Sequence, residues 1–200
     1  MSIEPIYRIA FWVVFAGMIA LQAYYASRAR QAGKREEASR KASVREGWGT
    51  AAVRVVRSIS LVAFLVLYAI NPPWFGVLSL PFPDWLRWTG AALGIVSLAL
   101  YAWSRDTLGN EWSSPLRLRE KHHLATAGPY ARIRHPIYLA LICFMTGIAL
   151  VTAHGFLVAL LVVSVVDLAL RIPKEEQMLI EAFGDAYTAY MHRTGRLFPG

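Results

Sequence analysis

The chain has 200 residues, of which 56% are hydrophobic, with seven tryptophans and a formal net charge of +8. This excess of apolar residues favours a multi-span membrane protein over a soluble globular domain, and the length leaves room for a single membrane domain. The one cysteine, Cys143, excludes an intrachain disulfide and a metal site built from cysteines. The basic residues lie between apolar stretches and form no recognisable nucleic-acid module, so nucleic acid is not an expected partner.

Three apolar spans are predicted in the first half of the chain. They cover residues from about 5 to 27, 51 to 70 and 85 to 103. The first lacks the basic flank and cleavage site of a secretory signal, so we expect it to stay in the mature protein. Arg54 and Arg57 lie near the start of the second and are expected to snorkel to the interface. Gly90 and Gly94 in the third form a small-residue pattern that packs either inside the bundle or between chains.

A hydrophobic hairpin follows in residues 136–172, which are almost wholly apolar apart from a turn at 152–155 and one acid, Asp167. At about 1.5 Å rise per residue, two helices of roughly 18 residues each run about 27 Å, close to the ~30 Å hydrocarbon core of a bilayer. The chain is therefore predicted to cross and return as spans 4 and 5. Arg134 and His135 at one end of the hairpin would then meet the charged residues that follow its other end.

The distribution of Lys and Arg predicts the orientation. The stretches 28–50 and 105–134 are rich in basic residues, whereas 71–84 has no Lys or Arg. The positive-inside bias then places the N-terminus outside and the C-terminus in the cytoplasm, which requires an odd number of spans. We accordingly divide the chain into residues 1–104, with spans 1 to 3 and the basic cytoplasmic loop 28–50, and residues 105–200, the expected cofactor-binding catalytic region.

The last part of the chain predicts an amphipathic cytoplasmic helix. Pro173 is expected to open it, because proline tolerates the first helical turn, with Glu175 and Glu176 favourable near its N-terminus. Apolar residues recur at helical spacing as far as Tyr190. The predicted fold is therefore an all-α, five-span polytopic membrane protein with a helical hairpin and this C-terminal helix.

Several short motifs lie in a fixed order around the hairpin. They are Leu108-Gly109-Asn110-Glu111-Trp112-Ser113, His123-Leu124, Gly128-Pro129-Tyr130, Arg134-His135-Pro136-Ile137-Tyr138, Arg171-x-Pro173-x-Glu175-Glu176, Phe183-Gly184-x-x-Tyr187-x-x-Tyr190 and Arg196-Leu197-Phe198-Pro199. In this order they resemble the isoprenylcysteine carboxyl methyltransferase family, from about Gly109 to the end. The resemblance implies a membrane enzyme that transfers the methyl group of S-adenosylmethionine to a lipophilic acceptor, usually the free carboxylate of a prenylated cysteine. Phospholipid N-methyltransferases share the Arg-His-Pro and Glu-Glu elements.

A pocket for S-adenosylmethionine needs a donor for its carboxylate, an acid for its ammonium, and aromatic or apolar walls. His135 and the backbone after Gly128 would hold the carboxylate, and Glu176 the ammonium. The resemblance places His123, Tyr130, His135 and the second acid of the Glu-Glu pair at cofactor-contacting positions. The predicted cofactor-binding residues are His123, Tyr130, Arg134, His135, Tyr138 and Glu176.

The acceptor is expected to meet Arg171, which with Glu175 forms the predicted catalytic pair. A carboxylate is already ionised at neutral pH and needs no base, but it needs a partner that holds it in line. Asp167 lies four residues before Arg171 on one helix face, so a local ion pair that positions Arg171 is predicted. An amine acceptor would instead need a proton acceptor, for which His135, Glu175 and Glu176 are candidates.

Three other interpretations stay open at this point. The chain is a phospholipid N-methyltransferase, an NADPH-dependent enzyme similar to membrane sterol reductases, or a non-enzymatic membrane scaffold that contacts lipids. In the last case Arg134 and Arg171 are interfacial anchors, and Glu175 and Glu176 stabilise a helix N-terminus by about 0.3–1 kcal/mol. No metal is expected, because the histidines at 122, 123 and 135 have no carboxylate at matching spacing and methyl transfer needs no metal.

Overall fold

A computed structural model describes residues 4–31, 48–109 and 124–200, without the side chains of residues 30, 31 and 48–54. The described part is helical and contains no strand, so the predicted all-α class is confirmed. The elements are α1 (Glu4–Gln31), α3 (Trp48–Ile70), η1 (Pro73–Leu78), α4 (Asp84–Leu108), η3 (Gly128–Ala131), α5 (Pro136–Thr152), α6 (Gly155–Phe183) and α7 (Asp185–Met191).

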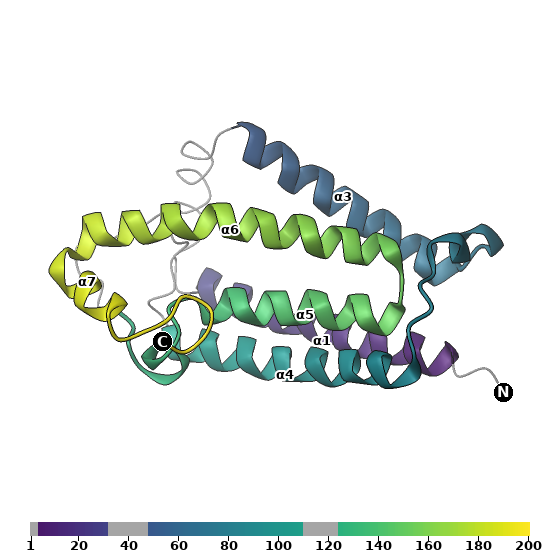
Figure 1. The fold of residues 1–200 in the computed structure, drawn as a ribbon, viewed down its shortest axis with the longest axis horizontal. Helices are drawn as coiled ribbons and strands as arrows, with labels where there is room; N and C mark the ends of the chain where they lie inside the picture. Colours follow the sequence, from purple (N-terminus) through teal and green to yellow (C-terminus); the bar gives the residue numbers. More distant parts are fainter. Residues whose placement is uncertain (1–3, 32–47, 110–123) are drawn as a thin grey trace.

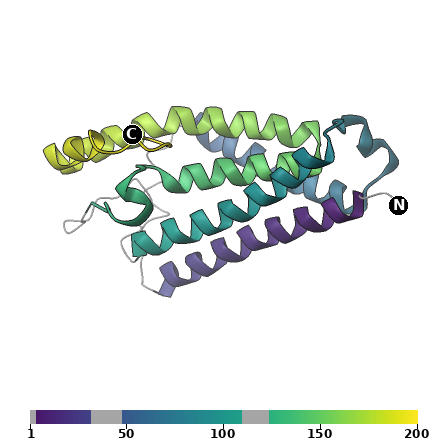
Figure 2. The ribbon, with the colours of Figure 1, turned by 60° about the horizontal axis from the view of Figure 1, so that its bottom comes forward.

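The helices α1, α4 and α5 form the packed body of the molecule, with α6 beside α5 (Figures 1 and 2). The C-terminal end of α3 contacts α1, where the rings of Phe11 and Tyr68 have centroids 4.7 Å apart. The closest approach is between α4 and α5: a Cβ atom added to Gly147 would lie 2.8 Å from the carbonyl oxygen of Gly90 and 2.8 Å from the amide nitrogen of Gly94. Only glycine permits this contact between backbones. The small-residue pattern of the third span therefore packs inside the bundle.

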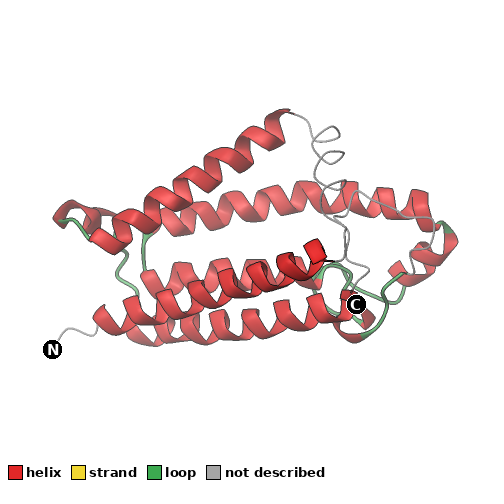
Figure 3. Cartoon of the chain, turned by 180° about the vertical axis from the view of Figure 1, so that it is seen from behind, coloured by secondary structure: helices red, strands yellow, loops and turns green. Residues whose placement is uncertain are grey.

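Successive long helices run in opposite directions. The N-terminus, η1 and the turn between α5 and α6 lie at one end, whereas η3, α7 and the C-terminus lie at the other (Figure 1). Viewed from behind, the first turns of α3 diverge from the rest of the bundle (Figure 3). By length and composition, α1 over Glu4–Ala29 and α6 over Gly155–Phe183 qualify as membrane spans, and Val55–Ile70 and Pro136–Thr152 are shorter apolar helices.

The end of the bundle near the N-terminus is held by Arg87, a residue that no sequence motif singles out. Its guanidinium contacts the Glu4 carboxylate at 2.6 Å and the Val151 carbonyl oxygen at 2.9 Å, and it lies 3.8 Å from the centre of the Tyr7 ring. The side chain is almost fully buried, which requires such partners for a charged group. Arg87 thus connects α1, α4 and the last turn of α5.

The prediction that Pro173 opens a new helix is wrong. The helix α6 continues through Pro173 to Phe183, and only then does Gly184, with φ 55°, separate it from the short α7. Proline removes the hydrogen bond to the carbonyl four residues earlier and normally breaks a helix. The helix persists here because Ile172 and Glu176, one turn apart on its buried face, are both fixed by tertiary contacts.

Candidate functional site

The polar end of the bundle brings together segments far apart in sequence. The C-terminal segment lies beside the residues that precede α5, since the Arg134 amide donates to the Gly195 carbonyl (2.8 Å) and the His135 amide to that of Arg196 (3.0 Å). The Gly195 amide in turn donates to the Arg132 carbonyl at 3.1 Å. The backbone therefore presents Arg134, His135 and Arg196 toward the end of α6.

Glu176, which is only 3% exposed, lies at the centre of this group. The Arg134 Nε donates to one carboxylate oxygen at 2.9 Å, and Arg196 donates to the other at 2.8 Å. Arg134 also donates to the carbonyl oxygens of Met191 (3.0 Å) and Thr194, so it fastens α7 and the C-terminal segment. A carboxylate has about four acceptor sites, so Glu176 still has capacity for a further donor.

His135 lies against the same carboxylate. Its Nε2 atom is 3.6 Å from a Glu176 oxygen and, among the described residues, has no hydrogen-bond partner. Burial lowers the pKa of the imidazole to about 4 and outweighs the opposing effect of Glu176. His135 is therefore neutral at pH 7, and a buried polar atom is left for a ligand to satisfy.

Tyr138 extends the site one turn into α5. Its ring stacks on His135 with centroids 5.4 Å apart and an interplanar angle of 9°. Its hydroxyl donates to Glu175 at 2.5 Å, and Arg171 is close enough to interact electrostatically with both. The predicted catalytic pair Arg171 and Glu175 thus lies beside predicted cofactor-binding residues.

Three tyrosines, Tyr130, Tyr187 and Tyr190, lie beside this cluster. The Tyr190 hydroxyl donates to the Tyr130 carbonyl at 2.7 Å, which joins α7 to η3. Burial raises the pKa of Tyr190 to about 12, so its phenol stays protonated. The Tyr187 hydroxyl is buried and, within the described part, has no hydrogen-bond partner.

Gly128, with φ 55°, lets η3 approach α4, because a Cβ atom there would lie 2.6 Å from the Thr107 hydroxyl.

Asp167 does not pair with Arg171. Its carboxylate is 3.3 Å from a guanidinium nitrogen of Arg57 on α3, so the predicted local ion pair is wrong. The i,i+4 spacing offers only a weak interaction, and the cation of a neighbouring helix replaces it here. At about 1.5 Å per residue, Asp167 lies about 13 Å along α6 from Glu176 and outside the cluster.

The structure thus brings Tyr130, Arg134, His135, Tyr138, Glu175 and Glu176 to one end of the bundle, with Arg171 at its edge. His123 lies outside the described residues. The site prediction missed Arg196, although it lies in a motif that carries the resemblance. Outside the cluster, the sequence predicts snorkelling for Arg57 and not its contact with Asp167. The site prediction also missed Arg105, which is 7% exposed and lies over the rings of Tyr25 and Tyr101.

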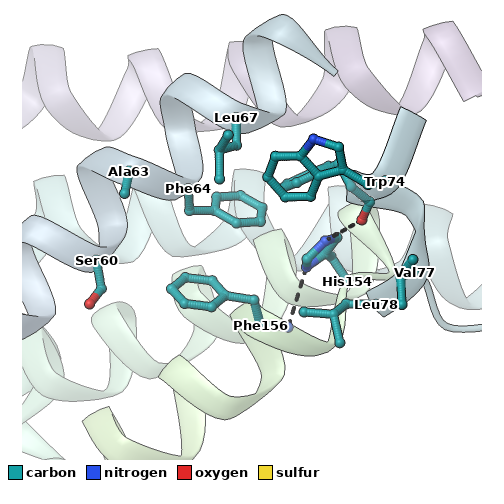
Figure 4. A pocket seen from close by; sticks show the side chains of 10 residues that line it. Ser60, Ala63, Phe64, Leu67, Trp74, Val77, Leu78, His154 and Phe156 are labelled. Carbon is teal, nitrogen blue, oxygen red and sulfur yellow. Dashed lines mark hydrogen bonds between the residues drawn. The ribbon is translucent and has the colours of Figure 1, made fainter. Parts of the chain in front are cut away.

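A cavity of about 550 Å³ lies at the opposite end, between α3, η1 and the start of α6 (Figure 4). Its lining includes Phe64, Trp74, Phe75 and Phe156. His154 is the one titratable residue among its lining residues. That imidazole is already used, since it contacts the Phe75 carbonyl at 3.2 Å and accepts from the Phe156 amide at 3.3 Å. The cavity fits an apolar chain and not a charged cofactor.

Within residues 4–31, 48–109 and 124–200, no group of three or more His, Cys, Asp or Glu side chains is placed to hold a metal ion.

The described part is an all-helical bundle with a buried polar cluster at one end, and two of its helices are long and apolar enough to cross a membrane. The fold is similar to that of a chain described as the eukaryotic intramembrane Ras methyltransferase ICMT (isoprenylcysteine carboxyl methyltransferase). The match has a TM-score of 0.60 and 22% identity and covers 95% of this chain and 67% of that chain.

The family model for the isoprenylcysteine carboxyl methyltransferase (ICMT) family matches residues 90–181, which confirms the resemblance predicted from the motifs. A curated relative is the cobalt-zinc-cadmium resistance protein CzcN of Cupriavidus metallidurans, which is 30% identical over 120 residues. The alignment covers 56% of this chain, and the chain spans about half of that relative's length (54%).

Proposed function

We propose that the chain is an S-adenosylmethionine-dependent methyltransferase of the membrane that methylates the carboxylate of a prenylated cysteine or a similar lipophilic acid. The observation that supports this most is the buried polar cluster around His135 and Glu176, both of which lie in the segment that matches the family. Residues 105–200 are the proposed catalytic region.

The cluster fits the cofactor by its chemistry. His135 Nε2 and the Tyr187 hydroxyl are buried polar atoms without partners among the described residues, and such atoms are costly unless a ligand satisfies them. Glu176 has acceptor capacity for an ammonium group, and the rings of Tyr130 and Tyr138 supply aromatic surface for flat or cationic groups. When bound, S-adenosylmethionine supplies an electrophilic methyl group on a sulfonium.

The protein's part in the transfer is positioning and exclusion of water. Arg171 holds the acceptor carboxylate, which is ionised at neutral pH and needs no base. Glu175 is fixed by the Tyr138 hydroxyl at 2.5 Å and balances the charge of Arg171. Neutral His135 adds no positive charge that would repel the sulfonium.

We further propose that α1, α3, α4, α5 and α6 are five membrane spans, with the N-terminus outside and the polar cluster at the cytoplasmic face. Their alternating directions support this topology, as does the basic character of the stretches at the cluster end (Figure 1). An acceptor with an insoluble tail then reaches the cluster laterally from the bilayer.

Titration of the detergent-purified protein with S-adenosylmethionine, S-adenosylhomocysteine and NADPH tests the proposal. We expect the two adenosyl ligands to bind and His135→Ala to weaken both, whereas His192→Ala, an exposed histidine outside the cluster, serves as the matched control. Binding of NADPH alone would favour a reductase. If none of the three ligands binds, the result would favour a non-enzymatic scaffold.

The acceptor class needs a second assay on the same preparation. Transfer of labelled methyl groups to a farnesylated cysteine with a free carboxylate is the expected result. Transfer to phosphatidylethanolamine instead would identify a phospholipid N-methyltransferase.

A further inference from the structure

The ion pair between Arg57 and Asp167 lies apart from the polar cluster, and mostly apolar residues flank both members in sequence. The two side chains come from α3 and α6, are 3.3 Å apart, and are 30% and 31% exposed. Charged residues inside spans are rare and usually serve a functional path or site. Their partial exposure shows that this pair lines a surface instead of a sealed core.

Aliphatic side chains close to the pair in sequence are exposed. Val166 and Leu170 on α6 are 53% and 65% exposed, and Val56 on α3 is 62% exposed. A cation and an anion surrounded by exposed branched side chains match an amphiphile whose charged head is attached to an apolar tail. A carboxylate head would compete with Asp167 for Arg57.

A polar stripe leads from this pair toward the cluster. Ser164, Asp167, Arg171 and Glu175 follow one another at spacings of three or four residues, so they share one face of α6. Arg171 lies about 6 Å further along the axis than Asp167, and Glu175 at the end of the stripe is bonded to Tyr138. Each arginine near the stripe has an acidic neighbour that a ligand carboxylate can replace.

We propose that Arg57 is a capture site for the carboxylate of the lipophilic acceptor, with Asp167 as the resident competitor that the acceptor displaces. The carboxylate then passes to Arg171, one helical turn nearer the cluster. This inference rests on the proposed function and extends it, because it assigns acceptor selection to α3, which lies outside the segment that matches the family. A lipid with a neutral head gains nothing from Arg57 and is not captured.

The test compares two substitutions at the two ends of one ion pair, in nanodiscs of neutral phosphatidylcholine. Arg57→Gln should lower kcat/KM for a farnesylated cysteine at least about tenfold through a higher KM, since a charge-assisted hydrogen bond is lost. Asp167→Asn should raise kcat/KM about two- to fivefold, because it removes the competitor. The affinity for S-adenosylmethionine should not change in either variant.

A purely structural role predicts something else: both substitutions break the same pair, so both would lower kcat/KM together with the thermal midpoint. A decrease in kcat/KM for Asp167→Asn, or no change for Arg57→Gln, would overturn the proposal. The double variant Arg57→Gln, Asp167→Asn leaves no unpaired charge and should behave like Arg57→Gln, which separates capture from misfolding.

Direct binding keeps the inference testable if no methyl transfer occurs. Radiolabelled farnesylcysteine should bind to the wild-type protein and at least about tenfold more weakly to Arg57→Gln, whereas its carboxamide should bind both equally. Failure of cofactor binding with this pattern intact would refute only the proposed methyltransferase function. Equal binding of the carboxylate to both proteins would refute the capture site, and binding of phosphatidic acid in its place would assign Arg57 to phospholipid headgroups.

Discussion

Glu176→Gln tests whether the carboxylate at the centre of the cluster holds the polar end together. The substitution keeps the shape of the side chain but removes the charge that offsets Arg134, whose side chain is only 8% exposed. Removing one partner of a buried ion pair costs about 3–5 kcal/mol, and the amide oxygen still accepts a hydrogen bond. We therefore expect a loss of about 3 kcal/mol, seen as a fall in thermal midpoint of roughly 6–12 °C in detergent.

Arg196→Gln is the matched control, because Arg196 contacts the same carboxylate at 2.8 Å from a side chain that is 55% exposed. Solvent screens such a contact, so its loss should cost less than about 1 kcal/mol. Equal midpoints for Glu176→Gln and the wild-type protein would refute the reasoning. An equally large effect of Arg196→Gln would also refute it, because the buried contact of Glu176 with Arg134 would then contribute no more to stability than its exposed contact with Arg196.

Three further outcomes follow from the geometry. His135 has a pKa of about 4 in the fold against 6.5 ordinarily, so its contribution to stability is complete above pH 6.5 and is lost as the pH falls toward 4. In unfolding measured at several pH values, the wild-type protein should lose about 3 kcal/mol more stability over this range than His135→Gln. Gly147→Ala places a Cβ atom 2.8 Å from a backbone oxygen of α4 and should lower stability by about 1–3 kcal/mol, whereas Gly76→Ala, whose nearest neighbour would lie at 3.9 Å, should be almost neutral. Tyr190→Phe leaves a buried carbonyl of η3 without its 2.7 Å donor and should cost about 1–3 kcal/mol in thermal unfolding.

The meeting of the two motif groups was predictable because it needs only a hairpin of the right length. Residues 136–172 are almost wholly apolar and return the chain, so Arg134 and His135 had to lie near Glu175 and Glu176. Local periodicity carries this kind of inference well. The same periodicity also predicts the all-helical class.

The choice of partner within the cluster was not predictable, because it depends on segments that have no periodicity. Arg196 reaches Glu176 only because backbone hydrogen bonds place the C-terminal segment beside Arg134. Arg57 and Asp167 are 110 residues apart in sequence, and nothing in either segment indicates their contact. Local rules instead favoured Arg171 for Asp167, and a helix start at Pro173, and tertiary contacts overrode both.

The backbone contact between α4 and α5 has a mechanical consequence. Where Gly147 meets Gly90 and Gly94, backbone atoms pack on backbone atoms with no side chains between them. These two helices therefore cannot slide or rotate past one another without a collision of peptide groups. They form a fixed frame. Any movement that admits or releases a bulky ligand must therefore be made by the other helices, among them α6, which begins after the junction at Ala153 and His154 and carries Glu175 and Glu176 far from it.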